Sequence, residues 1–125
     1  MITFIQCVRR RPEMSIQEFR EHWQLYVQRA RALAASTDAV GLFVNTTLAV
    51  EENLAVQLAR GTSAPFDGVL KFCWPNASGL EGRLGDPEVA HLVEDLQRHQ
   101  DVFIDHDQSS FFFASEETVI GNEQP

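Results

Sequence analysis

Three adjacent phenylalanines near the end of the chain constrain its fold more than any other feature. They lie in SSFFFASEETVI, residues 109–120, a stretch typical of a β-strand. Successive side chains of a strand point to opposite faces of its sheet, so Phe111 and Phe113 share one face while Phe112 takes the other. We therefore expect both faces of this strand to be covered.

The N-terminal segment predicts a strand followed by a long helix. Residues 2–9 alternate in a way that leaves both faces largely apolar, as in the last strand. Ser15 and Glu18 then form the S-x-x-E pattern of a capping box, which starts a helix of about twenty residues. Apolar residues follow at spacings of three and four, which indicates a core-facing stripe. The stripe comprises Phe19, Trp23, Tyr26, Val27, Ala30, Leu33 and Ala34.

The middle of the chain adds two strands and a second helical region. Residues 39–50 and 67–74 are rich in β-branched and aromatic residues and indicate strands. A short helical piece follows Ser78, and Asp86-Pro87-Glu88 is a strong start for a longer helix. We interpret residues 51–65 as a connection, although ENLAVQLARG could form a short helix closed by Gly61 and the segment could be a lid over a cleft.

The resulting order, βαββαβ, predicts an α+β fold of the ferredoxin-like type. Such a fold has a four-stranded antiparallel sheet with two helices on one face. The helices can cover Phe111 and Phe113, or Phe112, but not both sets. The opposite face therefore needs another partner, and the simplest candidate is a second copy of the chain.

Length and charge limit the class of protein. With 125 residues we expect one domain over residues 1–120 and a flexible tail over residues 121–125. The net charge of −8 argues against nucleic acid as a partner. We expect no membrane partner and a cytoplasmic location, because there is no apolar run of eighteen residues and no signal-peptide pattern at the N-terminus. Cys7 and Cys73 are expected to stay reduced.

Several motifs resemble the EthD family of the dimeric α/β-barrel superfamily. FIQCVRRRPEMSIQEFREHW is similar to the family's opening strand, Arg-Pro turn and Phe-x-x-x-Trp helix. Phe66-Asp67-Gly68 resembles the start of the family's third strand, Asp86-Pro87-Glu88 the start of its second helix, and FIDHDQSSFFFASEETVI its C-terminal block. The resemblance implies a homodimer that forms a dimeric α/β barrel. One Phe set would then line the barrel between the sheets and the other a pocket between sheet and helices.

One departure from the family pattern bears on activity. Family members commonly carry Trp-x-x-x-His-Gly-Pro on the first helix, whereas Val27-Gln28-Arg29 occupy the last three of those places after Trp23. An activity that depends on that histidine is not expected here.

Three residues are candidates for proton transfer. His22 and Tyr26 lie four apart on the first helix and could present a base and a hydroxyl to a ligand. His106 is flanked by Asp105 and Asp107, which could orient its ring. The same loop could instead cap the second helix, or could hold a cation together with His99 or Asp101. We expect no metal, because no ligand motif has the required spacing.

A second group of candidates would contact a ligand. Phe72 and Trp74 could form an aromatic wall, although a core role would also explain them. Asn45, like Gln6 and Thr47, is a polar residue within an apolar strand and either finds a hydrogen bond or lines a wet cleft. The predicted binding residues are Trp23, Asn45, Phe72, Trp74, Phe111 and Phe113. Arg9-Arg10-Arg11 could bind an anion, but we expect a solvated corner.

The resemblance implies a small enzyme without a cofactor. Such an enzyme would act on a small apolar, oxygenated or aromatic compound by proton transfer of the cyclase or isomerase type, as in the related polyketide cyclases and muconolactone isomerases. One alternative is a non-catalytic ligand-binding or accessory protein of an oxidative degradation pathway. Another is a structural dimer whose cleft is filled by its own side chains.

Overall fold

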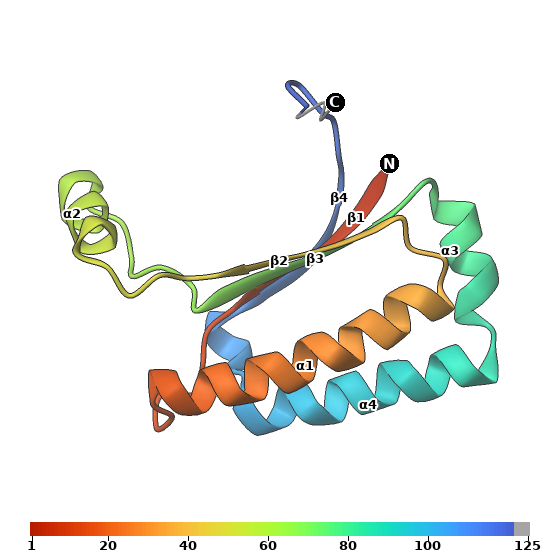
Figure 1. Cartoon of the computed structure of the whole chain (residues 1–125), viewed down its shortest axis with the longest axis horizontal. Coiled ribbons are helices and arrows are strands. Elements are labelled where there is room, and N and C mark those ends of the chain that lie inside the picture. The colour runs from red at the N-terminus through yellow and green to blue at the C-terminus, as the bar shows by residue number, and fades with distance from the viewer. Residues whose placement is uncertain (122–125) are drawn as a thin grey trace.

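The computed structural model describes residues 1–121 and shows one antiparallel sheet covered by helices on one side (Figure 1). The strands are β1 (Ile2–Val8), β2 (Gly41–Thr46), β3 (Gly68–Trp74) and β4 (Ser110–Ser115), in the order β2-β3-β1-β4. The helices are α1 (Ile16–Ser36), α2 (Glu51–Arg60), α3 (Ala77–Leu84) and α4 (Pro87–Phe103), with a short 3₁₀ turn at His106–Gln108. The predicted ferredoxin-like α+β fold is confirmed.

The helix starts agree with the sequence signals. Ser15 Oγ accepts the Glu18 amide at 3.0 Å and the Glu18 carboxylate accepts the Ser15 amide at 3.0 Å, so the capping box is present. Pro87 opens α4, where its missing N–H removes no helical hydrogen bond. Five residues of the α1 stripe are buried against the sheet and α4. They are Phe19, Trp23, Tyr26, Ala30 and Ala34.

Two predicted elements differ from the structure. The second strand is shorter than residues 39–50, because β2 ends at Thr46. The interpretation of residues 51–65 as a connection is wrong for its first part, which is the helix α2. Gly61, with φ of 65°, ends this helix in the left-handed conformation that glycine adopts without strain. The predicted tail, apart from Gly121, lies outside the described residues.

Strand register decides how the three phenylalanines are divided. Phe111 pairs with Gln6 and Phe113 with Phe4, and all four point toward the helices. Phe112 pairs with Ile5 on the opposite face, which we call the open face. No described helix lies across the open face (Figure 1). Strand register places Ile5, Cys7, Phe43, Val69 and Phe112 on the open face.

Candidate functional site

A mainly apolar cavity of about 200 Å³ lies between the helix-facing side of the sheet and helices α1, α3 and α4. Phe72 and Trp74 stack in one wall, with ring centroids 5.6 Å apart and planes at 6°. Phe111 and Phe113 form part of another wall. Four of the six predicted binding residues therefore line this cavity. The other lining residues are Phe4, Gln6, Leu33, Thr37, Leu80, Leu84, Val93, Leu96, Gln97 and Gln100.

Tyr26 lies behind this cavity and connects two of its polar groups. The Tyr26 hydroxyl donates to Gln6 Oε1 at 2.6 Å and accepts from Gln100 Nε2 at 2.8 Å. The tyrosine side chain is completely buried, and burial raises the pKa of its hydroxyl to about 12. At neutral pH the hydroxyl is therefore protonated. Tyr26 holds two glutamines that touch the cavity, while its own side chain is not among the lining residues.

Two amide groups in this chain of hydrogen bonds have unused capacity. Within residues 1–121, neither Gln6 Nε2 nor Gln100 Oε1 has a protein hydrogen-bond partner. Neither atom is among the fully buried atoms that lack a partner. Because both residues border the cavity, a ligand could accept a hydrogen bond from Gln6 and donate one to Gln100.

His22 and His99 form a separate pair between α1 and α4. His22 Nδ1 lies 3.1 Å from His99 Nε2, and the two rings border a surface hollow that also contains Arg29. Burial, with smaller contributions from Arg29 and His22, lowers the pKa of His99 to about 4, so its ring is neutral at pH 7. His99 Nδ1 is buried without a partner in the described part of the chain. This pair does not line the cavity.

The remaining predicted residues lie elsewhere. His106 is half-exposed and pairs with Asp101 at 3.1 Å, so His22, Tyr26 and His106 do not converge on one cavity. Trp23 is in the core, where its indole N–H donates to Thr46 at 3.1 Å. Asn45 lies on the open face, because strand alternation turns it away from its neighbours Val44 and Thr46.

None of the residues that line the cavity is ionisable. The cavity offers aromatic and aliphatic surface together with amide and hydroxyl groups. This arrangement can bind and orient a neutral compound, but its walls supply no carboxylate, imidazole or amine for proton transfer.

Sequence reasoning missed Thr37 and the two polar residues that α4 contributes to the cavity wall, Gln97 and Gln100. The two glutamines follow Val93 at spacings of four and seven residues, which places all three on one face of α4. An apolar residue such as Val93 is expected to face the core. The same spacing was a signal that the two glutamines would face inward as well.

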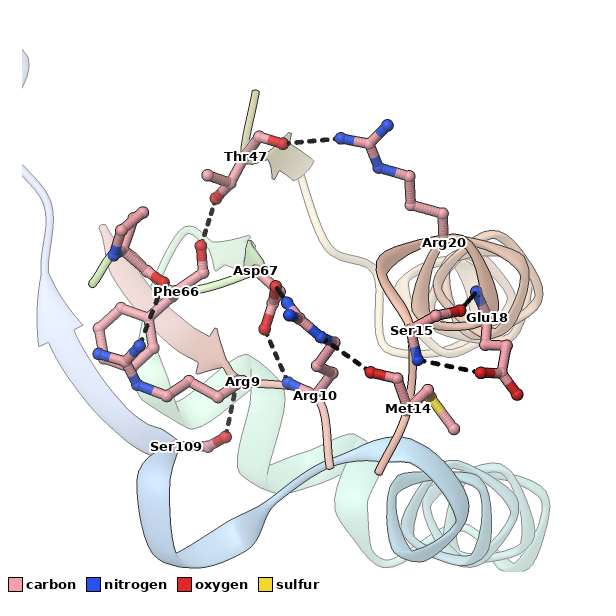
Figure 2. A network of polar contacts seen from close by, with 11 residues as sticks. Arg9, Arg10, Met14, Ser15, Glu18, Arg20, Thr47, Phe66, Asp67 and Ser109 are labelled. Atoms are coloured by element: carbon pink, nitrogen blue, oxygen red, sulfur yellow. Dashed lines mark hydrogen bonds and ion pairs between the residues drawn. The ribbon is translucent and has the colours of Figure 1, made fainter. Parts of the chain in front are cut away.

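The three consecutive arginines are occupied by hydrogen bonds within the chain, and Figure 2 shows those of Arg9 and Arg10. The Arg10 guanidinium pairs with Asp67, and the Arg10 amide donates to the Asp67 carboxylate at 2.8 Å. Arg9 donates to Pro65 O at 3.1 Å and lies 4.5 Å from the centre of the Phe66 ring. Arg11 pairs with Glu13 at 2.9 Å. The Arg-Pro turn and the Phe66-Asp67-Gly68 motif therefore bind one another.

Residues 1–121 lack two further features, a metal-binding cluster and a membrane-spanning helix. No three His, Cys, Asp or Glu side chains lie close enough together to hold a metal ion. None of the described helices combines the length and the apolar character needed to cross a membrane.

Comparison with known proteins identifies the family. The family model described as EthD domain matches residues 11–107, which is most of the chain. The chain belongs to the EthD family. An EthD-family protein from Bacillus halodurans c-125 is 14% identical, with a TM-score of 0.60 over 94% of this chain and 99% of that chain. No curated protein matches the chain significantly.

Two other solved structures share the fold. A dimeric protein of unknown function with a ferredoxin-like fold, from Bacteroides fragilis NCTC 9343, is 9% identical, with a TM-score of 0.61 over 92% of this chain and 95% of that chain. A candidate antibiotic biosynthesis monooxygenase from Deinococcus radiodurans is 15% identical, with a TM-score of 0.53 over 98% of each chain. At these identities the likeness establishes the fold of the EthD-family chain.

Proposed function

We propose that this EthD-family protein binds one small, neutral, oxygenated ring compound in the cavity beneath the sheet. The observation that carries the proposal is the combination of aromatic walls with two unpaired amide groups from Gln6 and Gln100. Ligand sites are typically apolar clefts with a few polar groups that set orientation. The cavity of about 200 Å³ is somewhat larger than the roughly 150 Å³ engineered cavity that holds benzene, which favours a single substituted ring.

The polar groups of the cavity restrict the chemistry of the ligand. The free N–H of Gln6 requires an acceptor, such as a carbonyl or lactone oxygen, and the free oxygen of Gln100 requires a donor, such as a hydroxyl. A charged ligand is disfavoured, because no wall residue carries an opposite charge and burial of an unpaired ion is costly. Phenols, quinones and lactones with one polar edge meet these conditions.

A fluorescence titration tests the binding proposal. Trp74 lines the cavity and Trp23 does not, so a bound ring should quench Trp74 in a saturable way. Gln6→Leu should weaken binding about tenfold, the effect of one lost hydrogen bond of roughly 1.4 kcal/mol. Gln24→Leu, which changes an exposed glutamine of α1, is the matched control and should bind normally. Equal affinities for the two variants would contradict the proposed orientation.

A cofactor-free enzyme of the cyclase or isomerase type is the second candidate. The observation that favours it is the link from the Tyr26 hydroxyl through Gln6 to the cavity. A carbonyl bound to Gln6 would be polarised, and groups that stabilise developing negative charge on oxygen lower the barrier to proton removal beside the carbonyl. Because no wall residue is ionisable, water in the open cavity would accept this proton. The polarising network would be Tyr26 with Gln6, since His22 and His106 border other hollows.

Deuterium exchange into the bound compound separates the two candidates. Catalysis predicts exchange beside the carbonyl, and Tyr26→Phe should slow it at least tenfold without a matching loss of affinity. A compound that binds tightly and is returned unchanged supports the non-catalytic role, in which the protein holds or delivers an intermediate of an oxidative degradation pathway.

We also propose that two copies pair through the open face. Phe43 and Phe112 on this face are 52% and 42% exposed, and large exposed apolar patches mark interaction sites. The chain shares its fold with the Bacteroides protein, which is described as dimeric. Sedimentation velocity over a dilution series tests the proposal, and a monomer at all concentrations would refute it.

A further inference from the structure

Helix α2 leaves its leucines exposed, unlike an ordinary surface helix. Its two half-buried residues are polar, Asn53 and Gln57, and Asn53 Nδ2 donates to Leu48 O at 2.7 Å. Leu54 and Leu58 are 55% and 71% exposed, and no residue of the helix is buried. A surface helix normally turns its apolar side toward the core. The outward leucines therefore lack the cover that such a helix requires.

Local signals nevertheless specify a helix in this segment. Glu51 and Glu52 lie in its first turn and Arg60 in its last, which complements the helix dipole, and Gly61 closes its C-terminus. A helix of ten residues is marginally stable by itself and normally depends on packing of its apolar side. In this helix Leu54 and Leu58, four residues apart, are neighbours on one face and form a single apolar stripe.

The two chain segments that lead to α2 are anchored to the body of the protein (Figure 2). Thr47 N donates to Asp67 O at 3.1 Å, and the Thr47 hydroxyl bonds to Phe66 O. Arg20 of α1 donates to Thr47 O at 3.1 Å, and Asp67 is in turn paired with Arg10. The chain is therefore anchored both before and after the helix. An anchored element loses less conformational freedom when it binds a partner.

The position of α2 argues against a lid over the cavity of its own chain. The helix precedes the Gly68 end of β3, whereas Trp74, at the other end of β3, lines the cavity. In Figure 1 the helix lies beyond one end of the sheet, and α3, which borders the cavity, lies beyond the other. The helix also stands on the side of the sheet opposite to α1 and α4, which is the side of the open face.

We propose that α2 is an arm that packs its Leu54 and Leu58 stripe against a second copy of the chain. The inference rests on the open-face dimer proposed above and extends it. Four strands about 4.8 Å apart, each about 20 Å long, present a flat area of roughly 400 Å². Stable dimers bury about 800 Å² on each partner. Measured as flat area, the sheet supplies about half of that value.

Elements that extend beyond the sheet supply further area. A ten-residue helix is about 15 Å long and about 10 Å wide, so α2 adds roughly 150 Å² to the face of each copy. The segment after β4 also extends toward the open-face side (Figure 1), and it carries Val119 and Ile120, both largely exposed. In a two-fold dimer each copy contributes these elements, so every added contact occurs twice.

The dimer dissociation constant tests the arm. Leu54→Ser/Leu58→Ser should raise the constant at least 100-fold, because both leucines lose apolar burial in each of two equivalent contacts. Val56→Ser is the matched control: Val56 is 55% exposed, like Leu54, but lies on the opposite side of the helix. It should change the constant less than threefold. Circular dichroism should show that both variants remain folded.

Hydrogen exchange identifies what covers the Leu54 and Leu58 stripe. The amides of α2 should be protected from exchange at protein concentrations above the dimer dissociation constant and should exchange rapidly at concentrations below it. A wild-type chain that is monomeric at all concentrations would overturn both the dimer and the arm. A dimer whose dissociation constant is unchanged in the double variant would overturn the arm alone. Protection that persists in the monomer, or that appears only with phosphatidylcholine vesicles, would overturn the arm in favour of the chain's own surface or a lipid surface.

Discussion

Replacement of Tyr26 by Phe should destabilise the protein by about 2–4 kcal/mol. The hydroxyl is completely buried, and its removal leaves Gln6 Oε1 without a donor inside the protein. An unsatisfied buried acceptor costs about 1–3 kcal/mol. The bond from Gln100 contributes roughly 1 kcal/mol more, because Gln100 is only half-buried and can turn to water. The ring itself fills the same space in both variants.

Urea denaturation of four proteins measures this effect. The wild type, Tyr26→Phe, Gln6→Leu and the double variant form a cycle in which the two single losses should not add. We expect a coupling free energy of at least 1 kcal/mol, because the double variant removes the donor and the acceptor together. A loss below 1 kcal/mol in Tyr26→Phe, or strict additivity in the cycle, would refute the role of this hydrogen bond.

The pH dependence gives an independent check, because Tyr26 is the only tyrosine of the chain. Its folded-state pKa of about 12 exceeds the ordinary value of 10.0, so its contribution is fully present below pH 10 and is lost as the pH rises toward 12. Between pH 10 and pH 12 the free energy of unfolding of the wild type should fall by about 2–3 kcal/mol relative to that of Tyr26→Phe. A tyrosinate absorbance that appears near pH 10 in the native protein would contradict the burial argument.

Two further predictions concern the core and the helix pair. The pKa of His99 is lowered from 6.5 to about 4, so the free energy of unfolding should fall by about 2–4 kcal/mol as the pH falls from 6.5 to 4, because the unfolded chain then binds the extra proton. His99→Phe should flatten this part of the profile of stability against pH, whereas His91→Gln, at an exposed position, should leave it unchanged. Equal slopes in all three proteins would count against the assignment. Gly68→Ala should destabilise by about 1–3 kcal/mol, because the new Cβ would lie 2.7 Å from the Trp23 ring; Gly82→Ala, which meets nothing within 4 Å in α3, should be neutral or stabilising by up to about 1 kcal/mol in thermal unfolding.

Much of the fold could be predicted because its signals are local. The capping box at Ser15, the proline at the start of α4 and the apolar stripe of α1 act within a few residues of sequence. The helix α2 was interpreted as a connection for the converse reason. The loop composition of GTSAP, residues 61–65, favoured a connection, and the leucines of the helix are not covered by any of residues 1–121, so no core-facing stripe supported the helix.

The candidate site was predictable for its aromatic walls and in part for Gln6, whose polar side chain in an apolar strand indicated a hydrogen bond or a cleft position. Phe72, Trp74, Phe111 and Phe113 are in strands whose alternation indicates which residues share a face. His22 and His106 have suitable chemistry, but their distance from the cavity depends on how α1 packs on α4 and on the path of the chain after α4. The inward turn of Gln100 likewise depends on its hydrogen bond to Tyr26, 74 residues away.

The sequence by itself determined that the last strand carries large apolar side chains on both faces, because alternation along a strand is a property of the backbone. Only the tertiary structure decided that Phe111 and Phe113 face the cavity while Phe112 faces outward. That choice rests on the register between β1 and β4. A shift of one residue would exchange the two faces, and packing of the whole sheet against α1 and α4 selects one register.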